Sequence, residues 1–481
     1  MEKYISAFGK NDIRGIYKET ITEELYTKVG RAFVRYIKKY SENKDNINVS
    51  VCRDARLHSK SLSDALIEGL MLEGANVIDL GLAPTPIGYY SEFAGVNGEQ
   101  IDGALIVTAS HNPPQYNGLK MTFKYQTLNE SQIQEVRDIV FNENYNEDPK
   151  KLGNLKVYNL ISDYIGDMKE RFGKIGQGLK VVVDSANATG GIVAPQLYRD
   201  LGCDVVELFS EPDGNFPNHH PNPSDIKTLD IIRKTVVEEG ADFGIAFDGD
   251  SDRIGVIDSQ GNPLTGDKLL LIYAKDIIDN AKEKGLQMPK VVSEVKCSQV
   301  LYDKINEYGG QSIMCKTGHG YIKGKMKETG AILAGEMSGH TFFKDRYFGF
   351  DDAIYAGCRI IEIVQKNKKQ NSLFKIEQLL EPFNKVYSSQ EVRLSCPNEL
   401  KAPTLKSFEK TLNSEKNLFN NPIKDIITLD GLRIVFDDGF ALIRQSNTEP
   451  VFTLRFEASN QDLAKSYEKT MVDTINRLMR V

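Results

Sequence analysis

One pattern occurs three times at long spacing along this chain: an apolar strand, a polar loop, a helix that ends at glycine, and a second strand. The predicted strand pairs are 47–51 with 76–80, 179–183 with 204–208, and 291–292 with 312–315. The glycines after the three helices are Gly74, Gly202 and the pair Gly309-Gly310. Glycine there can adopt the left-handed conformation that closes a helix. Strand–helix–strand units indicate mainly parallel sheets with right-handed crossovers.

The last hundred residues follow a different pattern. Strands are predicted over 384–394, 431–437, 440–445 and 450–458, and a hairpin turn is predicted at Asp437-Asp438-Gly439. A long amphipathic helix is expected from about residue 460 to the end. This part of the chain therefore reads as an α+β domain.

The expected fold class is α/β, with three related mixed α/β domains that have parallel-rich sheets, followed by a C-terminal α+β domain, arranged around a central cleft. The chain has 481 residues, which fits several domains at roughly 100–200 residues each. The expected domains are 1–155, 156–257, 258–372 and 373–481.

Charge and cysteine usage narrow the class of protein. The net charge is -7, which argues against nucleic acid as the main partner, since phosphate backbones select for basic surfaces. The six cysteines show no C-x-x-C pair, a pattern that fits a reducing compartment. We see neither a signal-peptide pattern nor an apolar run of membrane-spanning length, so a cytoplasmic protein with no membrane partner is expected.

The first loop that could carry chemistry is Thr108-Ala109-Ser110-His111-Asn112-Pro113-Pro114, followed by Asn117-Gly118-Leu119-Lys120. An apolar strand, 104–107, runs directly into it, and α/β sheets bind ligands at such strand ends. The prolines restrict the backbone, so Ser110 should project from a rigid turn. A plain surface turn is the alternative. A Ser–His hydrolase is less favoured, because adjacent side chains usually diverge and no G-x-S-x-G motif occurs.

The second loop is Asp248-Gly249-Asp250-Ser251-Asp252-Arg253, and it follows the apolar strand 243–247. Three carboxylates at every second position repel one another unless a cation binds them, and oxygen ligands suit Mg²⁺, Mn²⁺ or Ca²⁺. An EF-hand is disfavoured, because Arg253 occupies its glycine position and Ser259 its final glutamate position. The alternative is a solvated acidic turn.

Two further loops carry polar side chains. In Gly335-Glu336-Met337-Ser338-Gly339-His340, the polar residues alternate as on an extended segment, so Glu336, Ser338 and His340 could face one ligand. In Arg444-Gln445-Ser446-Asn447-Thr448-Glu449-Pro450, a guanidinium, hydroxyls and an amide suit a phosphate, although a polar hairpin connection is equally possible.

Nucleotide-binding motifs are missing from the sequence. Gly318, Gly320 and Gly324 are spaced one residue too far for G-x-G-x-x-G, and no G-x-x-x-x-G-K-[ST] motif occurs. A dinucleotide or P-loop ATP enzyme is therefore disfavoured.

Taken together, the four loops resemble those of the α-D-phosphohexomutase family, and within it the bacterial phosphomannomutase/phosphoglucomutase branch. The resemblance covers nearly the whole chain. It includes Asp12-Ile13-Arg14-Gly15, Arg53-Asp54-Ala55-Arg56, Pro212-Asp213-Gly214-Asn215-Phe216-Pro217-Asn218-His219, Val295-Lys296-Cys297 and Lys316-Thr317-Gly318-His319-Gly320. Asn11, where an aromatic residue is common in this branch, and Cys52, where glycine is common, depart from the pattern.

The resemblance implies a role for each site residue. Ser110 would carry the phosphoryl group, and Asp248, Asp250 and Asp252 would bind Mg²⁺ with a phosphoserine oxygen. The residues around the phosphoserine would be Arg14, His111, Lys120 and Arg253. Those that hold the sugar would be Lys296, His319, Glu336, Ser338 and His340. Those that bind the non-reacting phosphate would be Arg444, Ser446, Asn447 and Thr448.

The activity implied by the resemblance is reversible phosphoryl transfer between O1 and O6 of mannose and glucose phosphates, through phospho-Ser110 and a hexose 1,6-bisphosphate that is also the activator. Gly-Glu-Met-Ser in the third loop implies glucose and mannose substrates rather than N-acetylglucosamine phosphate. Lys120 and His319 are both candidates for the general acid or base. A phosphomonoesterase and a catalytically silent sugar-phosphate sensor are the rival hypotheses. A monomer or a weak homo-oligomer is expected.

Overall fold

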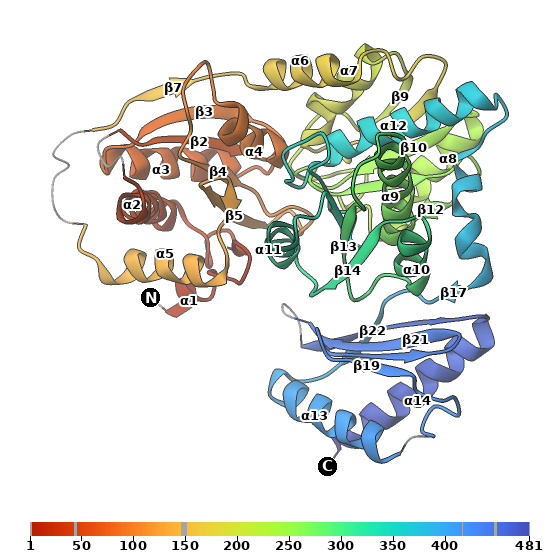
Figure 1. The fold of residues 1–481 in the computed structure, drawn as a ribbon. Helices are drawn as coiled ribbons and strands as arrows, with labels where there is room; N and C mark the ends of the chain where they lie inside the picture. The colour runs from red at the N-terminus through yellow and green to blue at the C-terminus, as the bar shows by residue number, and fades with distance from the viewer. Residues whose placement is uncertain (1, 43–45, 146–151, 416, 447–449, 481) are drawn as a thin grey trace. The chain divides into compact units, whose positions relative to one another are not determined.

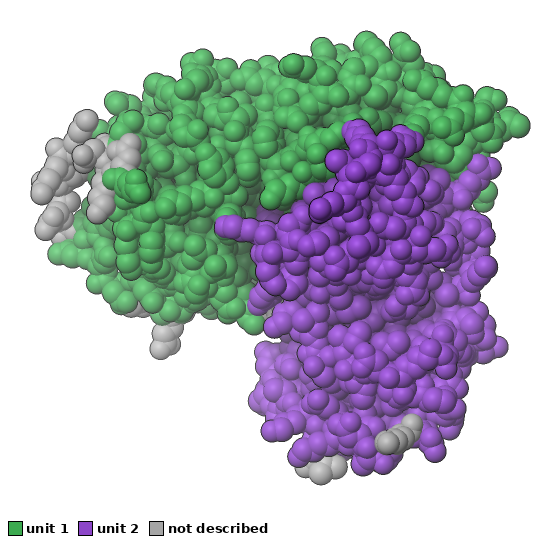
Figure 2. Space-filling view, in the orientation of Figure 1, with its two compact units in different colours: residues 1–265, 338–376 green, residues 266–337, 377–481 purple. Residues whose placement is uncertain are grey.

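The computed structural model describes residues 2–42, 46–145, 152–415, 417–446 and 450–480. Figure 1 labels the helices and strands of the chain. The chain forms two compact units, each built from two separate stretches (Figure 2). Unit 1 contains residues 1–265 and 338–376, and unit 2 contains residues 266–337 and 377–481. Within the described ranges, no helix is both long and apolar enough to cross a membrane.

The first part of unit 1 is an α/β sheet with helices on its faces. Its elements are α1 (Glu2–Ile5), β1 (Ile13–Ile16), α2 (Glu23–Tyr40), β2 (Asn48–Arg53), α3 (Ser59–Leu72), β3 (Asn76–Leu82), α4 (Thr85–Ala94), β4 (Gly103–Val107), β5 (Tyr116–Phe123), β6 (Gln126–Thr127), α5 (Glu130–Asn142) and β7 (Leu155–Val157). The strand order is β1-β5-β4-β2-β3-β7, with β6 beside β5. Strands β4, β2, β3 and β7 are parallel, and β5 is antiparallel to β1 and β4.

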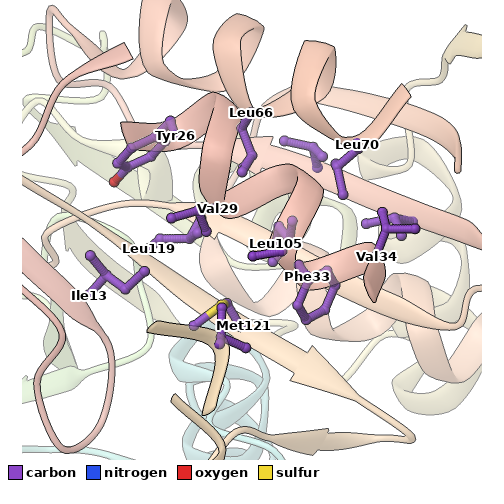
Figure 3. Close-up of a cluster of buried hydrophobic side chains, with 14 of the residues drawn as sticks. Ile13, Tyr26, Val29, Phe33, Val34, Leu66, Leu70, Leu105, Leu119 and Met121 are labelled. Atoms are coloured by element: carbon purple, nitrogen blue, oxygen red, sulfur yellow. The ribbon is translucent and has the colours of Figure 1, made fainter. Parts of the chain in front are cut away.

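The alternating sides of β2 explain the two helical layers. Val49 and Val51 belong to the core that α2, α3 and α5 cover, which is drawn in Figure 3. Ser50 and Cys52 belong to the other face, where Ser50 contacts Ser91 of α4 through their hydroxyls at 2.7 Å. Side chains alternate along a strand, so β2 is buried on both faces, as parallel strands normally are.

The second part of unit 1 repeats the design with a smaller sheet. Its elements are α6 (Ile161–Phe172), β8 (Lys180–Asp184), η1 (Thr189–Ile192), α7 (Ala194–Asp200), β9 (Asp204–Leu208), η2 (Ile226–Leu229), α8 (Asp230–Glu238), β10 (Phe243–Phe247), β11 (Ile254–Ile257) and β12 (Pro263–Leu264), and later β16 (Thr341–Phe343) and α12 (Ala353–Gln370). The strand order is β12-β11-β10-β8-β9, in which β8 is parallel to both β9 and β10.

Unit 2 contains a third parallel sheet and the antiparallel C-terminal sheet. Its elements are α9 (Gly266–Glu283), β13 (Lys290–Glu294), α10 (Gln299–Glu307), β14 (Gln311–Cys315), α11 (His319–Thr329), β15 (Leu333–Gly335), β17 (Tyr387–Ser388), β18 (Val392–Ser395), α13 (Asn398–Ser414), β19 (Asp425–Ile427), β20 (Leu432–Phe436), β21 (Gly439–Gln445), β22 (Val451–Ala458) and α14 (Gln461–Met479). Helix η3 (Ile376–Lys385) begins at the boundary between the units. Strand β13 is parallel to β14 and β15.

The predicted fold class is confirmed: three repeats form parallel-rich sheets, and an α+β arrangement follows. Gly74, Gly202 and Gly309 all have positive φ just after their helices, as the repeat requires. The expected strand over 384–394 is wrong, because η3 extends to Lys385 and two short strands follow it. Tyr387 pairs with Ala458 and Val392 with Leu454, so the pairing register shifts by one residue between β17 and β18.

Candidate active site

Ser110 lies in a tight loop at the end of β4, in the middle of the first sheet of unit 1. Its backbone has a φ of 49°, which is unusual for a residue with a side chain. The Ser110 amide donates to Thr108 Oγ1 at 2.9 Å, and Ser110 is only 2% exposed. The sequence therefore places a strained, buried serine at a strand end, where ligands bind in α/β folds.

The Ser110 side chain contacts both an acid and a base. Its Oγ donates to Asp248 Oδ2 at 2.6 Å and lies 3.1 Å from His111 Nδ1. The expectation that the side chains of Ser110 and His111 diverge is wrong. The left-handed backbone at Ser110 changes the direction in which the two neighbouring side chains leave the main chain, and no local sequence rule anticipates this conformation.

The predicted acidic loop follows β10, and its three carboxylates converge. Asp248, Asp250 and Asp252 are buried, and each offers a ligand atom within 4.8 Å of the others. Asp250 Oδ1 is buried and has no hydrogen-bond partner among the residues that the structure describes. Three close carboxylates, with an acceptor oxygen left over, fit a hard divalent cation such as Mg²⁺.

Cationic side chains surround these carboxylates. Lys120 Nζ is 2.6 Å from Asp250 Oδ2 and also contacts Asp252. Arg253 donates its amide to Asp248 Oδ1 at 3.2 Å. His340 Nε2 lies 3.3 Å from both Asp252 Oδ1 and Arg253 Nε. The acidic loop is thus balanced by the positive charges of Lys120 from β5 and Arg253 from its own end, and it also contacts the His340 imidazole from the segment before β16.

Arg14 approaches the Ser110 loop from β1. Its Nη1 donates to Asn112 Oδ1 at 2.6 Å, and its Nη2 contacts Asp12. Burial opposes the charge of Arg14, but Asp12, Asp250 and Asp252 outweigh it and raise the pKa of Arg14. Arg14 therefore stays a cation beside the loop that carries Ser110.

Burial and neighbouring charges shift the pKa values of the site residues in different directions. Burial, and then the charges of Asp252 and Asp250, raise the pKa of Asp248 well above its usual range. Burial also acts against ionised Asp252, but Lys120 and His340 outweigh it and hold its pKa well below the usual range. For Lys120, burial is outweighed by Asp250 and Asp252, so its pKa is well above normal.

His111 is kept neutral. Burial, followed by the positive charges of Arg253 and Arg14, lowers the pKa of His111 well below that of free histidine. A neutral imidazole next to a hydroxyl can accept a proton, whereas a protonated Lys120 cannot. The Ser110 hydroxyl has one proton and two possible acceptors for it, Asp248 Oδ2 at 2.6 Å and His111 Nδ1 at 3.1 Å.

The third predicted loop forms a turn and is not extended as expected. Residues 337–338 turn, and Gly339 has a φ of 94°, with its backbone packed so closely against Ile254 that a Cβ would lie 2.4 Å from the Ile254 carbonyl oxygen. Glu336 belongs to unit 2, while Ser338 and His340 belong to unit 1. Ser338 Oγ lies 3.1 Å from His340 Nδ1, so these two side chains form one contact group with the acidic loop.

In unit 2, the predicted sugar-binding residues Lys296, His319 and Glu336 follow the parallel strands β13, β14 and β15, respectively. Lys296 follows β13, and its Nζ lies 3.6 Å from Glu294 Oε1 and 3.5 Å from Glu391 Oε2. Glu336 follows β15 and accepts from the Gly318 amide at 2.7 Å, directly before His319. Burial opposes the charge on Lys296, but Glu294 and Glu391 outweigh it and raise its pKa.

Arg444 lies at the end of β21 in the antiparallel sheet of unit 2. Its Nε donates to Asp430 Oδ2 at 3.0 Å and its Nη1 to Thr453 Oγ1 at 3.3 Å. Asp430 Oδ2 also accepts from the Thr317 amide at 3.0 Å, so one carboxylate joins the Arg444 strand to the loop before His319. The Ser446 amide donates to the Val451 carbonyl at 3.1 Å. Asn447 and Thr448 lie outside the described residues.

The sequence reasoning missed two supports of the site. Thr85, the first residue of α4, donates its hydroxyl to Asp250 Oδ2 at 2.5 Å and its amide to the Asp250 carbonyl at 2.8 Å. Arg56 donates to the Ser110 carbonyl at 2.9 Å and pairs with Asp54 at 3.0 Å. Arg56 stands in a motif quoted for the resemblance, but nothing in the sequence shows which groups it contacts.

Four family models match consecutive parts of the chain. They are described as phosphoglucomutase/phosphomannomutase alpha/beta/alpha domain I, domain II and domain III, and as the phosphoglucomutase/phosphomannomutase C-terminal domain. The matched residues are 6–147, 162–261, 265–383 and 391–474. Together they account for most of the chain.

Full-length relatives agree with these matches. A phosphomannomutase/phosphoglucomutase of Pseudomonas syringae pv. tomato is 39% identical over 456 residues, which cover 94% of this chain and 91% of the relative. A phosphoglucomutase of Neisseria gonorrhoeae is 38% identical over 454 residues, covering 94% and 93%. The crystal structure of a phosphoglucomutase/phosphomannomutase family protein from Burkholderia thailandensis matches with a TM-score of 0.86 and 34% identity over 98% of both chains. This chain therefore belongs to the phosphoglucomutase/phosphomannomutase family, and it is an isomerase of that family.

Proposed function

We propose that the chain moves a phosphoryl group reversibly between O1 and O6 of hexose phosphates, with both mannose and glucose phosphates as substrates. The observation that carries the proposal is the contact between Ser110 Oγ and Asp248 Oδ2 at 2.6 Å. It places a nucleophilic hydroxyl against a buried acidic cluster that is ringed by cations. Phosphoryl transfer needs alignment and charge neutralisation above all, and this arrangement supplies both.

Ser110 is the proposed carrier in a cycle of two transfers. In the first, the bond between phosphorus and Ser110 Oγ breaks while the free sugar hydroxyl forms a new bond to phosphorus, which gives a hexose 1,6-bisphosphate. The bisphosphate reverses its orientation, and Ser110 Oγ then takes the other phosphoryl group. A trace of hexose 1,6-bisphosphate would restore phospho-Ser110 whenever it is lost to water.

Asp248, Asp250 and Asp252 are the residues that would hold Mg²⁺, together with an oxygen of phospho-Ser110. The bound ion would neutralise charge on the phosphoryl oxygens. The three buried carboxylates and the spare acceptor at Asp250 Oδ1 support this assignment.

The proton steps divide between neutral and charged groups. Lys120 has a raised pKa and therefore acts as a fixed positive charge, not as the general base. His111 is neutral and lies next to Ser110, so we propose that it accepts the proton of the Ser110 hydroxyl in the second transfer. Lys120 is thus set aside as a base, and His319 remains the candidate for the sugar hydroxyl.

The residues that we assign to the sugar and to the non-reacting phosphate lie mainly in unit 2. Lys296, His319 and Glu336 suit sugar hydroxyls, because they combine a cation, an imidazole and a carboxylate. Arg444 and Ser446 suit the phosphate that does not react, since guanidinium binds phosphate through two parallel hydrogen bonds. Asn447 and Thr448 belong to the same proposed loop. Ser338 and His340 are proposed sugar contacts that also border the acidic loop of unit 1.

The decisive experiment follows mannose 1-phosphate in the presence of MgCl2 and a trace of glucose 1,6-bisphosphate. The proposal expects mannose 6-phosphate as the product, almost no inorganic phosphate, and loss of the reaction in Ser110→Ala. Ser407→Ala, on the exposed side of α13, is the matched control and should keep full activity. Release of inorganic phosphate would identify a phosphomonoesterase instead, and no turnover of any sugar phosphate would favour a silent sensor.

Relative kcat/KM on three hexose 1-phosphates tests the substrate range. Mannose and glucose phosphates should be used at comparable rates, because Glu336 and Ser338 would contact hydroxyls that the two sugars share. A kcat/KM on N-acetylglucosamine phosphate equal to that on glucose phosphate, with little on mannose phosphate, would contradict the proposal.

A further inference from the structure

Arg56, in the loop after β2, uses all of its hydrogen-bonding capacity within unit 1. Its side chain is fully buried. Nε donates to Asp54 Oδ2 at 3.0 Å, Nη1 to the carbonyls of Pro113 and Tyr116, and Nη2 to the carbonyls of Ser110 and Asn112. A guanidinium has five N–H groups, and these five bonds account for each of them.

Four of the five acceptors belong to one short segment, residues 110–116. The distances to its carbonyl oxygens are 2.9 Å for Ser110, 2.6 Å for Asn112, 2.6 Å for Pro113 and 3.1 Å for Tyr116. The carbonyls of a tight loop cannot all accept from backbone amides as they do in a sheet; of these four, Pro113 also accepts the Tyr116 amide at 3.0 Å. One buried cation therefore donates to four of the carbonyls in the loop that carries Ser110.

The guanidinium is itself fixed from two sides. Asp54 accepts from Arg56 and also from Thr108 Oγ1 at 2.9 Å, and Thr108 Oγ1 in turn accepts the Ser110 amide. Phe216 lies against the guanidinium, with its ring centre 5.3 Å from the Arg56 carbon Cζ. Both the amide and the carbonyl of Ser110 are thereby tied to the Asp54–Arg56 pair.

This support is needed because Ser110 is in a conformation that a serine rarely adopts alone. A left-handed backbone on a residue with a side chain persists only when the surroundings fix it from several directions. We infer that Arg56 is the positioning residue that holds the 110–116 loop so that Ser110 Oγ stays within reach of Asp248. The inference rests on the proposed role of Ser110 as the phosphoryl carrier. Arg56 acts through backbone carbonyls and is not a catalytic residue.

Lysine cannot replace this arginine. A lysine ammonium has three donors on one atom, while the four carbonyls and the Asp54 carboxylate need five donors spread over a planar fork. Arg56→Lys preserves the charge and most of the volume, but its three donors on one atom cannot reproduce the five bonds that Arg56 makes in five directions. The expected consequence is a loop that samples several conformations while the rest of unit 1 stays folded.

The test compares Arg56→Lys with a matched control, Arg359→Lys. Arg359 in α12 is also fully buried, pairs with Asp345 at 2.8 Å and lies 4.7 Å from the Phe343 ring centre, and none of its contacts given for the described residues involves the Ser110 loop. Both variants lose a buried guanidinium in the same unit, so both should lower Tm. Steady-state kinetics, intact mass and the ³¹P NMR signal of phospho-Ser110 are measured for each.

Arg56→Lys should lower kcat by about 10²-fold with KM changed by less than about threefold, since a small misplacement of a reacting group has that effect. Its phosphoserine ³¹P signal should broaden or split. Arg359→Lys should keep kcat within about twofold and a single sharp signal, because it leaves the reacting groups in place. Wild-type kcat in Arg56→Lys, or an equal loss of kcat in both variants, would overturn the inference.

Two further results separate the inference from the function on which it rests. If wild-type protein incubated with glucose 1,6-bisphosphate carries no phosphate on Ser110, the carrier assignment fails whatever Arg56 does. If Arg56→Lys does not fold, Phe216→Leu takes its place, because it removes the ring against the guanidinium and keeps every hydrogen bond. Its kcat should fall at least about threefold at unchanged KM, and an unchanged kcat would contradict the inference.

Discussion

Asp248 and Asp252 show how strongly position decides the behaviour of identical side chains. They are four residues apart in one loop, yet the pKa of Asp248 is raised and that of Asp252 lowered. Both are buried, but Lys120 and His340 lie against Asp252, while Asp248 faces Ser110. The neighbours of Asp252 therefore stabilise its ionised form, whereas burial and like charges disfavour the ionised form of Asp248.

Removing one carboxylate of the acidic loop should disable the proposed metal site. Asp250→Asn keeps the size of the side chain and removes its charge, so kcat should fall by about 10²-fold, the usual effect of losing one electrostatic contact to a reacting group. The MgCl2 concentration that gives half-maximal activity should also be much higher than for the wild type. Asp230→Asn, at an exposed position of α8, is the control and should match the wild type. An unchanged MgCl2 dependence in Asp250→Asn would contradict the metal assignment.

Two histidines should give the stability of unit 1 opposite pH dependences. The pKa of His111 is lowered by burial and by Arg253, so the unfolded chain binds the extra proton and stability falls as pH drops below about 6.5. Burial also acts on His219, but its bonds to Asp184 outweigh it and raise its pKa. His219 therefore contributes stability that is present below about pH 6.5 and lost as pH rises through its folded-state pKa.

The variants His111→Asn and His219→Asn test these signs through Tm measured between about pH 7.5 and about pH 5.5, the range in which histidine titrates. On acidification, His111→Asn should lose less Tm than the wild type, and His219→Asn should lose more. Parallel Tm profiles for all three proteins would show that neither histidine is coupled to folding.

Single residues also mark the limit of what the sequence could predict. The three aspartates were predictable, because regular spacing after an apolar strand and mutual repulsion both point to a cation. The Ser110–His111 contact and the role of Arg56 were not, because both depend on one left-handed backbone angle in a loop. Strain of this kind is fixed by surrounding tertiary contacts, and local patterns do not record it.

At the scale of secondary structure, several of the proposed site residues lie just after the ends of parallel strands. Ser110 follows β4, Asp248 follows β10 and Lys296 follows β13. Repetition of a strand, a helix and a glycine predicted all three sheets, since each glycine after a helix needs positive φ. The short strands β17 and β18 were predicted as one strand, because a register shift within an antiparallel pair leaves the hydrophobic alternation almost unchanged.

The turn between β19 and β20 should control binding of the non-reacting phosphate. Asp430 accepts from both Arg444 and the Thr317 amide at 3.0 Å. Asp430→Ala should free Arg444 from its bound orientation and raise KM for glucose 1-phosphate about tenfold, with a smaller effect on kcat, because a binding contact is lost while the reacting groups are unchanged.

Asp425→Ala is the matched control for Asp430→Ala. Asp425 lies on β19 and is exposed. Among the hydrogen bonds of the described residues, its side chain accepts only from the neighbouring Ile426 amide. The KM of Asp425→Ala should therefore stay within about twofold of the wild type. If Asp430→Ala lowered kcat and left KM unchanged, Asp430 would instead belong to the chemical step.

For the whole molecule, sequence segments and compact units divide the chain differently. The family models follow the chain in four consecutive segments, whereas residues 338–376 pack with unit 1 and their neighbours 266–337 with unit 2. Packing joins them because Tyr164, far earlier in the chain, donates to Asp352 at 2.9 Å, and Tyr198 donates to the Ile354 carbonyl at 3.1 Å. Sequence patterns predict elements and their order, but long-range contacts of this kind leave no local signal. The four predicted domain ranges stay predictions.

The proposed function assigns the reacting phosphoryl group to unit 1 and the other phosphate to unit 2, and hydrogen exchange can test this division. MgCl2 alone should slow exchange in 104–120 and 243–254, whereas inorganic phosphate should slow it in 430–446, since a ligand stabilises the elements that bind it. Glucose 1,6-bisphosphate should slow exchange in both sets together. Asp250→Asn should remove only the first effect and Arg444→Ala only the second. If the bisphosphate protected a single unit in the wild type, the two sets of residues would not act on one substrate.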